Sequence, residues 1–208
     1  MHKLRGTRLT VLAAAAALAV GGALTPTAQA AEGTTSLVSV LTSGKVGFDK
    51  NDKDYDVLTA AVQAVLTAKP DSPVKVLADG NTALTAFIPN DKAFAHLVKA
   101  LTKKLPKTEK ATFQGVAALG IDTVEQVLLY HVVPGSTILS PDALKANGAK
   151  LTTALEGKVL KVAVKGTTIR LGDYSKSADP KVILSQVDIN KGNLQVAHGI
   201  DAVLLPNA

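Results

Sequence analysis

The chain has 208 residues, no Cys and no Trp, 47% hydrophobic residues and a formal net charge of +6. This length suits one domain, or two small ones, with a core large enough to fold unaided. The lack of cysteine excludes disulfides, thiolate zinc sites, a cysteine nucleophile and a lipidated cysteine anchor. At 19% charged residues the chain is too apolar to be disordered.

Residues 1–30 have the pattern of a secretory signal peptide, with three cations before an uncharged, Ala- and Leu-rich stretch at 9–20. That stretch is too short to span a bilayer comfortably. The Ala-Gln-Ala sequence at 28–30 has the form of a cleavage site. We therefore predict cleavage after Ala30 and a secreted, soluble chain of residues 31–208, loosely associated with the cell wall and without stable membrane insertion.

Removal of the signal lowers the apparent basicity. It leaves 20 Lys plus Arg against 17 Asp plus Glu, a net charge of +3, and Arg170 is then the only arginine. Proteins that read nucleic acids rely on arginines and stacking aromatics, which are scarce here. A nucleic-acid partner is therefore not expected, and the lysines are interpreted as a solubilising surface.

The first half of the secreted chain predicts helices around one strand. A polar lead-in at 31–54 precedes a helical pattern that begins at Tyr55 and is stopped by prolines at 70 and 73. A buried strand is expected from Thr82 to Ile88, and Asn90 is well placed to cap the helix that follows. The stretch between Lys69 and Asn81 is interpreted as a loop.

Three more helices are expected before the pattern changes. The first runs from Thr108 to Leu119, and the second opens with Asp122 in a capping-box arrangement and runs through Leu129. A short third helix begins at Ser140.

The last part of the chain predicts strands. Residues 160–164 alternate between apolar and polar, and Thr167–Leu171 completes a hairpin. Val182–Ile189 and Leu194–Leu205 are two further strand candidates. Helices first and strands last, without regular alternation, indicate an α+β domain. Residues 55–208 are assigned to this single domain, with residues 31–54 packed on it or extending it.

The chemistry-bearing residues form no recognisable catalytic, cofactor or metal motif. His96, His131 and His198 lack metal-ligand spacing, and the last two lie in apolar strings typical of hydrogen-bonded core histidines. Serine-hydrolase, phosphate-loop and dinucleotide motifs are absent. We therefore predict no enzymatic activity and no cofactor.

Four aspartates at 49, 52, 54 and 56 have the density of a calcium loop. Aligned from Asp49, however, the fifth position is Lys53 and the sixth is Asp54, where an EF-hand loop needs an oxygen ligand and Gly. The sequence therefore favours a solvated loop neutralised by lysines, and no metal site is predicted.

Three segments of the chain together form a distinctive pattern. The first is Thr85–Phe94, with the sequence TAFIPNDKAF, and the second is Leu129–Val133, LYHVV. The third is Val187–Ile189, followed by the closing stretch Val196–Pro206. In this order and at this spacing the segments resemble the fasciclin (FAS1) domain family, and the resemblance covers about Tyr55 to Pro206. The chain resembles a bacterial, secreted, monomeric, single-domain member of that family.

The resemblance implies a β-wedge or sandwich of about seven strands with several packed helices, and a role in adhesion. It implies contacts to a partner through Tyr130, His131, Asp188 and Ile189. Phe87 and Phe94 are expected to anchor strand and helix in one core. The full set of expected fold-determining residues is Phe87, Pro89, Asp91, Phe94, His198 and Asp201.

The favoured function is therefore a secreted, non-enzymatic adhesion or binding protein whose partner is an extracellular protein or polysaccharide of a cell surface, wall or matrix. Two alternatives stay open. One is an extracellular carrier of a small apolar ligand, favoured by the aliphatic composition. The other is an exported hydrolase that uses scattered acids.

Overall fold

A computed structural model describes residues 33–43, 47–175 and 178–206, so the predicted signal peptide lies outside the described residues. The α-helices are α1 (Leu37–Thr42), α2 (Asp56–Ala68), α3 (Asp91–Thr102), α4 (Glu109–Ala117), α5 (Ile121–Tyr130) and α6 (Ser140–Ala143). Two 3₁₀ helices are η1 (Pro73–Ala78) and η2 (Leu184–Gln186). The strands are β1 (Leu84–Pro89), β2 (Val132–Pro134), β3 (Lys150–Thr152), β4 (Val159–Lys165), β5 (Thr168–Gly172) and β6 (Gln195–Ile200).

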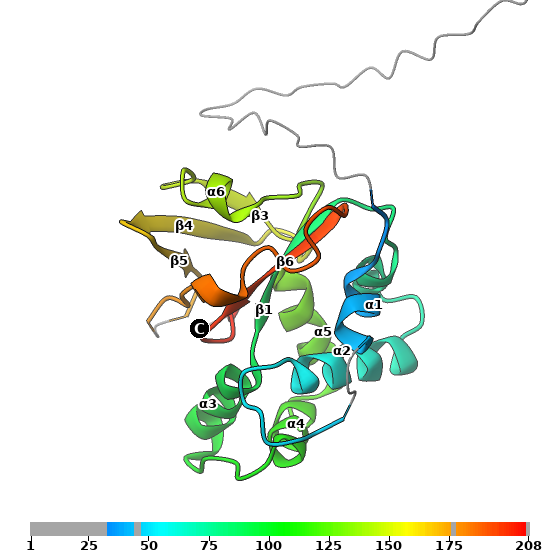
Figure 1. Ribbon diagram of the computed structural model, residues 1–208. Coiled ribbons are helices and arrows are strands. Elements are labelled where there is room, and N and C mark those ends of the chain that lie inside the picture. The colour runs from blue at the N-terminus through cyan, green and yellow to red at the C-terminus, as the bar shows by residue number, and fades with distance from the viewer. Residues whose placement is uncertain (1–32, 44–46, 176–177, 207–208) are drawn as a thin grey trace, which may run out of the picture.

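The strands form two three-stranded sheets. In the first, central β1 pairs antiparallel with β2 and parallel with β6, so that Phe87 lies opposite His198. The second is the antiparallel sheet β3-β4-β5. Figure 1 shows β1 and β6 between the helices α1–α5 and the second sheet. Every residue of β1 and β6 is buried, which explains why both strands are mostly apolar and why their polar side chains are hydrogen-bonded inside the domain.

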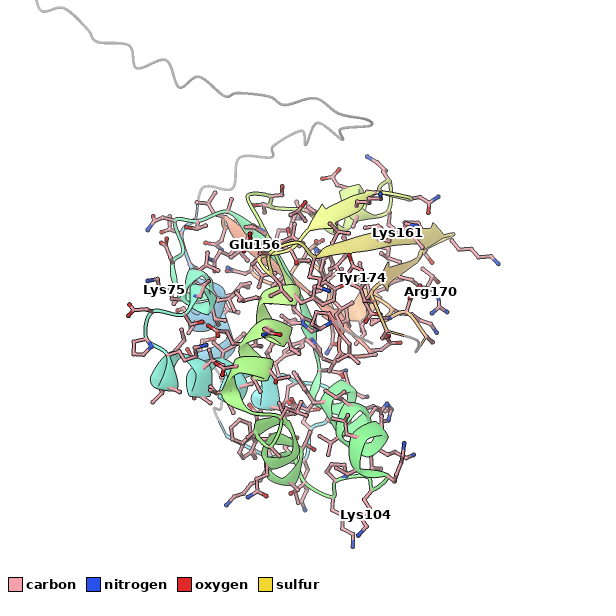
Figure 2. The ribbon with its side chains drawn as sticks, turned by 180° about the vertical axis from the view of Figure 1, so that it is seen from behind. Lys75, Lys104, Glu156, Lys161, Arg170 and Tyr174 are labelled. Carbon is pink, nitrogen blue, oxygen red and sulfur yellow. The ribbon has the colours of Figure 1, made fainter. Side chains whose placement is uncertain are left out.

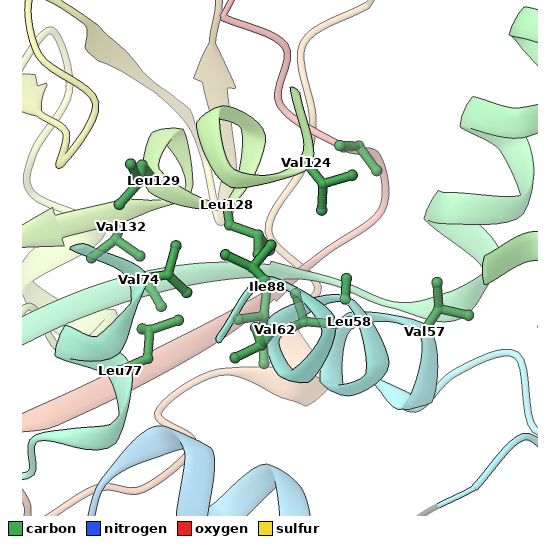
Figure 3. Packing of buried hydrophobic residues seen from close by; sticks show 14 of the residues in the cluster. Val57, Leu58, Val62, Val74, Leu77, Ile88, Val124, Leu128, Leu129 and Val132 are labelled. Atoms are coloured by element: carbon green, nitrogen blue, oxygen red, sulfur yellow. The ribbon is translucent and has the colours of Figure 1, made fainter. Parts of the chain in front are cut away.

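The buried side chains form two clusters, one on each side of β1. In the first cluster, Ile88 contacts the region of α2 and α5 that presents Val62 and Leu128 (Figure 3). The second cluster contains Phe87 and fills the space against the second sheet. Phe94 belongs to the first cluster, so the expectation that Phe87 and Phe94 share one core is wrong. Successive strand residues point to opposite faces, which separates Phe87 from Ile88 and its helical neighbours.

Two element boundaries test the local sequence interpretation. The Asn90 side chain caps α3 by accepting a hydrogen bond from the Ala93 amide at 3.0 Å, as predicted. The capping box at Asp122 is wrong, because α5 begins after Gly120 without a side-chain cap. Asp122 instead forms an ion pair with Lys69 at 2.8 Å.

The segment 182–189 is not the continuous strand that was expected. It makes isolated β-bridges from Val182 to Ile200 and from Ile189 to Ala197, with η2 between them. A left-handed backbone at Asp188, with φ of 55°, interrupts the extended conformation. The described residues therefore contain six strands rather than about seven, within the predicted α+β class.

The lead-in is tied to the domain at several points. Leu37, the first residue of α1, is buried and its amide donates to Gln195 Oε1 at 2.8 Å. Gly33 forms a parallel bridge with Asn193. Across the described part of the chain, none of the helices has the length and apolar character needed to cross a membrane.

Candidate functional site

Tyr130 and His131 are core residues with side chains 0% and 4% exposed. The Tyr130 hydroxyl donates to the carbonyl oxygen of Val159 at 3.2 Å. His131 lies just after α5, where Nδ1 contacts the Val127 oxygen at 2.6 Å and Nε2 accepts from the Leu204 amide at 3.0 Å. In this conformation neither side chain is available on the surface to contact a partner.

Asp188 and Ile189 are only partly buried and hold neighbouring elements together. The Asp188 carboxylate accepts from the amide of Ser140 at 2.7 Å and from its hydroxyl at 2.6 Å. Ile189 exchanges two backbone hydrogen bonds with Ala197, each 3.0 Å long. Among the described residues, no hydrogen bond joins Asp188 or Ile189 to the Tyr130–His131 pair.

His198 is 1% exposed and is bonded through both ring nitrogens. Its Nδ1 accepts from the Asp188 amide at 3.3 Å, and its Nε2 donates to the Ile138 oxygen at 2.8 Å. His131 has the opposite tautomer, with the proton on Nδ1, because its Nε2 accepts. Burial lowers the pKa of both rings, that of His131 to about 4, and both are neutral core residues.

We expect acid to destabilise the protein through His131. Its folded-state pKa of about 4 lies below the usual value of about 6.5, so the unfolded chain binds the proton first as pH falls. The stabilisation of the folded state by neutral His131 is fully present above about pH 6.5 and is lost between about pH 6.5 and 4. It amounts to on the order of 3 kcal/mol in total. Urea unfolding across this range measures it.

The matched variants are His131→Leu, which should flatten the pH dependence in that window, and His96→Gln at an exposed helix position, which should preserve it. A His131→Leu protein with an unchanged slope would contradict this assignment, because His198 would then account for the whole effect.

The remaining motif residues contact the backbone of neighbouring elements. The Asp91 carboxylate accepts from the amides of Val57 at 2.9 Å and Asp56 at 3.2 Å, and so caps α2 from the start of α3. Pro89 ends β1 opposite Ile200. The Asp201 carboxylate accepts from the Lys181 amide at 2.7 Å.

An acidic cluster lies where the loop before α2 meets α3 and α4. Carboxylate oxygens of Asp54, Asp91 and Glu109 all lie within 4.8 Å of one another. Burial, followed by the contact with Asp54, holds the pKa of Asp91 well above its usual range. Residues 49–53 are exposed, as expected for a solvated loop, but within the described residues no lysine forms an ion pair with these acids.

Sequence reasoning identified Asp54 but missed its partners in this cluster. Asp91 and Glu109 each follow a helix cap, where an acid is ordinary because it favours the helix dipole. Nothing in their spacing indicates that the three side chains converge.

A second charged feature covers the outward face of the sheet β3-β4-β5. We call it the basic face, and its cations are Lys150, Lys161, Lys165, Arg170 and Lys181. Lys161 lies directly opposite Lys150, and Arg170 forms a β-bridge with Lys181. The alternate residues of β4 and β5 are buried in the second cluster. The alternation of apolar and polar residues in β4 predicted that this face is exposed to solvent. It did not predict that cations from three strands and Lys181 gather on it.

The cations of the basic face have no acidic partner at ion-pair distance among the described residues. Arg170 donates through Nη1 to the backbone oxygen of Asp179 at 3.2 Å. Like charges directly opposite each other destabilise a sheet, so a bound anion would recover stability here. Figure 2 shows Lys161 and Arg170 on this sheet, and Lys75 and Lys104 on distant parts of the molecule.

The apolar interior offers little room for a carried ligand beneath α1. The cavity between α1, α2, β1 and α5 has a volume of about 20 Å³ and is lined by side chains that include Leu41, Leu58 and Leu77. A space of this size accommodates about one water molecule. In this conformation the cavity holds no apolar ligand of useful size.

The fasciclin domain matches residues 56–206, which is most of the chain. The chain belongs to the fasciclin domain family. Among solved structures, it is similar to a FAS1 domain pair from the insect cell adhesion molecule fasciclin I, with 15% sequence identity and a TM-score of 0.49. The similarity covers 71% of this chain and 46% of the insect one, so this fasciclin chain spans less than half of that structure.

No curated protein matches the sequence. The fasciclin match begins at α2, so α1 and the lead-in that carries it precede the family domain. Membership in this family makes the chain a FAS1-domain protein.

Proposed function

We propose that this fasciclin protein is secreted after cleavage at Ala30 and acts without catalysis as a binding protein for an anionic polymer of a cell surface, wall or matrix. The basic face is the binding surface in this proposal. The observation that carries it is the set of five cations on one exposed sheet, unpaired with any carboxylate among the described residues.

The spacing of these cations suits a repeating polyanion. Neighbouring strands lie about 5 Å apart, and residues on one face of a strand recur about every 7 Å. Lys150 and Lys161 are therefore close across neighbouring strands, whereas Lys165 lies farther along β4 on the same face as Lys161. A polymer with regularly spaced phosphates or carboxylates can contact several of these positions at once.

The family-implied residues are less suited to this role. Tyr130 and His131 are buried, and the Asp188 carboxylate is occupied by Ser140. Binding through Tyr130 and His131 would require the end of α5 to leave the core.

A charge-reversal experiment tests the proposal. Lys161→Glu combined with Arg170→Glu should weaken binding to purified anionic wall polymer at least tenfold at low ionic strength, and added salt should weaken wild-type binding. The matched control is Lys75→Glu combined with Lys104→Glu, which makes the same charge change on exposed positions elsewhere. Equal loss in both double variants, or no saturable wild-type binding, would refute the basic face as the site.

A further inference from the structure

The turn between α3 and α4 forms one end of the molecule, away from the sheet β3-β4-β5 (Figure 1). In Figure 2, Lys104 marks this end, whereas Lys161 of the basic face lies toward the other. We call residues 99–107, with the sequence KALTKKLPK, the helical tip. All of its residues except the half-buried Pro106 are exposed, so its side chains are presented to the solvent.

Two large apolar side chains of the helical tip are left uncovered by the domain. Leu101 is 53% exposed at the end of α3, and Leu105 is 54% exposed three residues after that helix ends. Neither belongs to a buried cluster or to the side chains packed against one. The fold therefore gains little from these leucines, and only a contact outside the chain would remove their apolar surface from water.

Four lysines accompany these leucines. They are Lys99, Lys103, Lys104 and Lys107, and the helical tip contains no Asp or Glu. In the part of the chain that the structure describes, none of the four forms an ion pair with a carboxylate. The helical tip therefore combines exposed apolar surface with uncompensated positive charge.

The acids nearest in sequence leave this charge in place. Asp91 is the first residue of α3, so the rise of the helix places it about 15 Å from Leu101. Glu109 follows the helical tip but is 7% exposed, and its carboxylate accepts from the Asp49 amide. Both acids are committed to the acidic cluster inside the domain.

Hydrogen bonds fix the turn that presents these side chains. The Lys103 amide donates to the Lys99 oxygen at 2.8 Å, which closes the last turn of α3. The Thr102 hydroxyl donates to the Val98 oxygen at 2.8 Å, and the Lys104 amide donates to that hydroxyl at 3.3 Å. The leucines are therefore presented on an ordered turn, so binding through them does not require a loop to be ordered first.

We propose that the helical tip binds the surface of an anionic lipid bilayer, with Leu101 and Leu105 entering the interfacial layer and the four lysines contacting lipid phosphates. Burial of apolar side chains and attraction of cations to anionic headgroups together bind peripheral proteins to membranes. Four lysines reach the cluster size that is typical of binding to anionic lipids. The contact is shallow and reversible, because only two apolar side chains enter the bilayer.

A lipid surface fits the helical tip better than the other possible partners. Two copies meeting here would bring together four lysines from each chain without an acid between them. A stable protein interface buries about 800 Å² on each partner, more than this short turn supplies. A soluble polyanion would pair with the lysines but leave the leucines in water. A bilayer satisfies both, and its fluid surface needs no matching shape.

A single tryptophan reports whether the helical tip enters the bilayer. The chain contains no Trp, so Leu105→Trp introduces the only one. Vesicles of equal parts phosphatidylglycerol and phosphatidylcholine, added to the full chain, should shift its emission to shorter wavelength. Leu184→Trp is the matched control, since Leu184 is 49% exposed on η2, and its emission should stay unchanged. A local readout is needed because the apolar stretch at 9–20 can itself bind vesicles.

Charge reversal in the Leu105→Trp background tests the lysines. Lys103→Glu combined with Lys104→Glu should weaken vesicle binding about tenfold or more, and added salt should act in the same direction. Lys161→Glu combined with Arg170→Glu makes the same charge change on the basic face and should preserve the shift. This second surface can therefore succeed or fail independently of polymer binding by the basic face.

Three results would overturn the proposal. One is an emission that phosphatidylglycerol vesicles leave unchanged in both Leu105→Trp and Leu101→Trp, which places a second reporter on the other leucine. Another is an equal shift with vesicles of phosphatidylcholine alone, which would remove the role of the lysines. The third is an equal shift with inorganic polyphosphate, which has no apolar layer and would assign the helical tip to a soluble polyanion.

Discussion

Replacing Phe94 with alanine should lower the free energy of unfolding by about 3–5 kcal/mol, the range for deleting a buried phenylalanine ring. Phe94 is 2% exposed and packs in the first cluster from helix α3. Because its neighbours are held by α2, α4 and β1, they have little freedom to fill the cavity. Urea unfolding followed by far-UV circular dichroism measures the loss.

The control for this prediction is Leu101→Ala on the same helix. Leu101 is 53% exposed, so its truncation should change stability by less than about 0.5 kcal/mol. A loss below about 1.5 kcal/mol for Phe94→Ala would contradict the placement of this ring in the core.

Replacing Gln195 with leucine should lower stability by about 3–5 kcal/mol, although the new side chain is apolar and of similar size. Gln195 is 0% exposed. Its Oε1 accepts from the Leu37 amide at 2.8 Å, and its Nε2 donates to the oxygens of Val76 and Asp79 at 2.7 Å each. Leucine leaves the buried Leu37 amide without an acceptor, at roughly 1–3 kcal/mol. It also removes one hydrogen bond each from the Val76 and Asp79 oxygens, which keep the amides of Asp79 and Thr82 as donors, at roughly 0.5–1.5 kcal/mol for each lost bond.

Hydrogen exchange gives this prediction a local measurement. The Leu37 amide should lose its protection in Gln195→Leu, since α1 then has no anchor on β6. Gln114→Leu changes an exposed residue of α4 and should alter neither stability nor Leu37 exchange. Protection at Leu37 equal to that of wild type would refute the anchoring role of Gln195.

The sequence predicted features that depend on local chemistry. The cap at Asn90, the α3 helix and the β4–β5 hairpin each follow from residues a few positions apart. The α+β class was predicted correctly, as was the fasciclin resemblance. The strand β1 was predicted to begin at Thr82 but begins at Leu84. The Thr82 hydroxyl instead donates a hydrogen bond to the Asp79 carboxylate at 2.7 Å, within the turn that precedes the strand.

The features that sequence reasoning missed depend on contacts between distant residues. Nothing near Gln195 indicates that its amide joins α1 to η1. The acidic cluster likewise joins Asp54 to Glu109 across two helices. The predicted strand at 182–189 is wrong because Asp188 has a left-handed backbone and its side chain accepts a hydrogen bond from the distant Ser140. The apolar residues around Asp188 gave no sign of either feature. Such contacts are set by topology, which periodicity does not encode.

The parallel pairing of β1 with β6 constrains when this chain can fold. The two strands are separated by about 110 residues, and β1 is the centre of its sheet. The sheet therefore remains incomplete until nearly the whole chain has been synthesised, and contacts of such long range slow folding. If the chain is exported as proposed, a polypeptide that stays unfolded in this way suits passage through a membrane translocase in an extended form, because the domain then assembles after translocation.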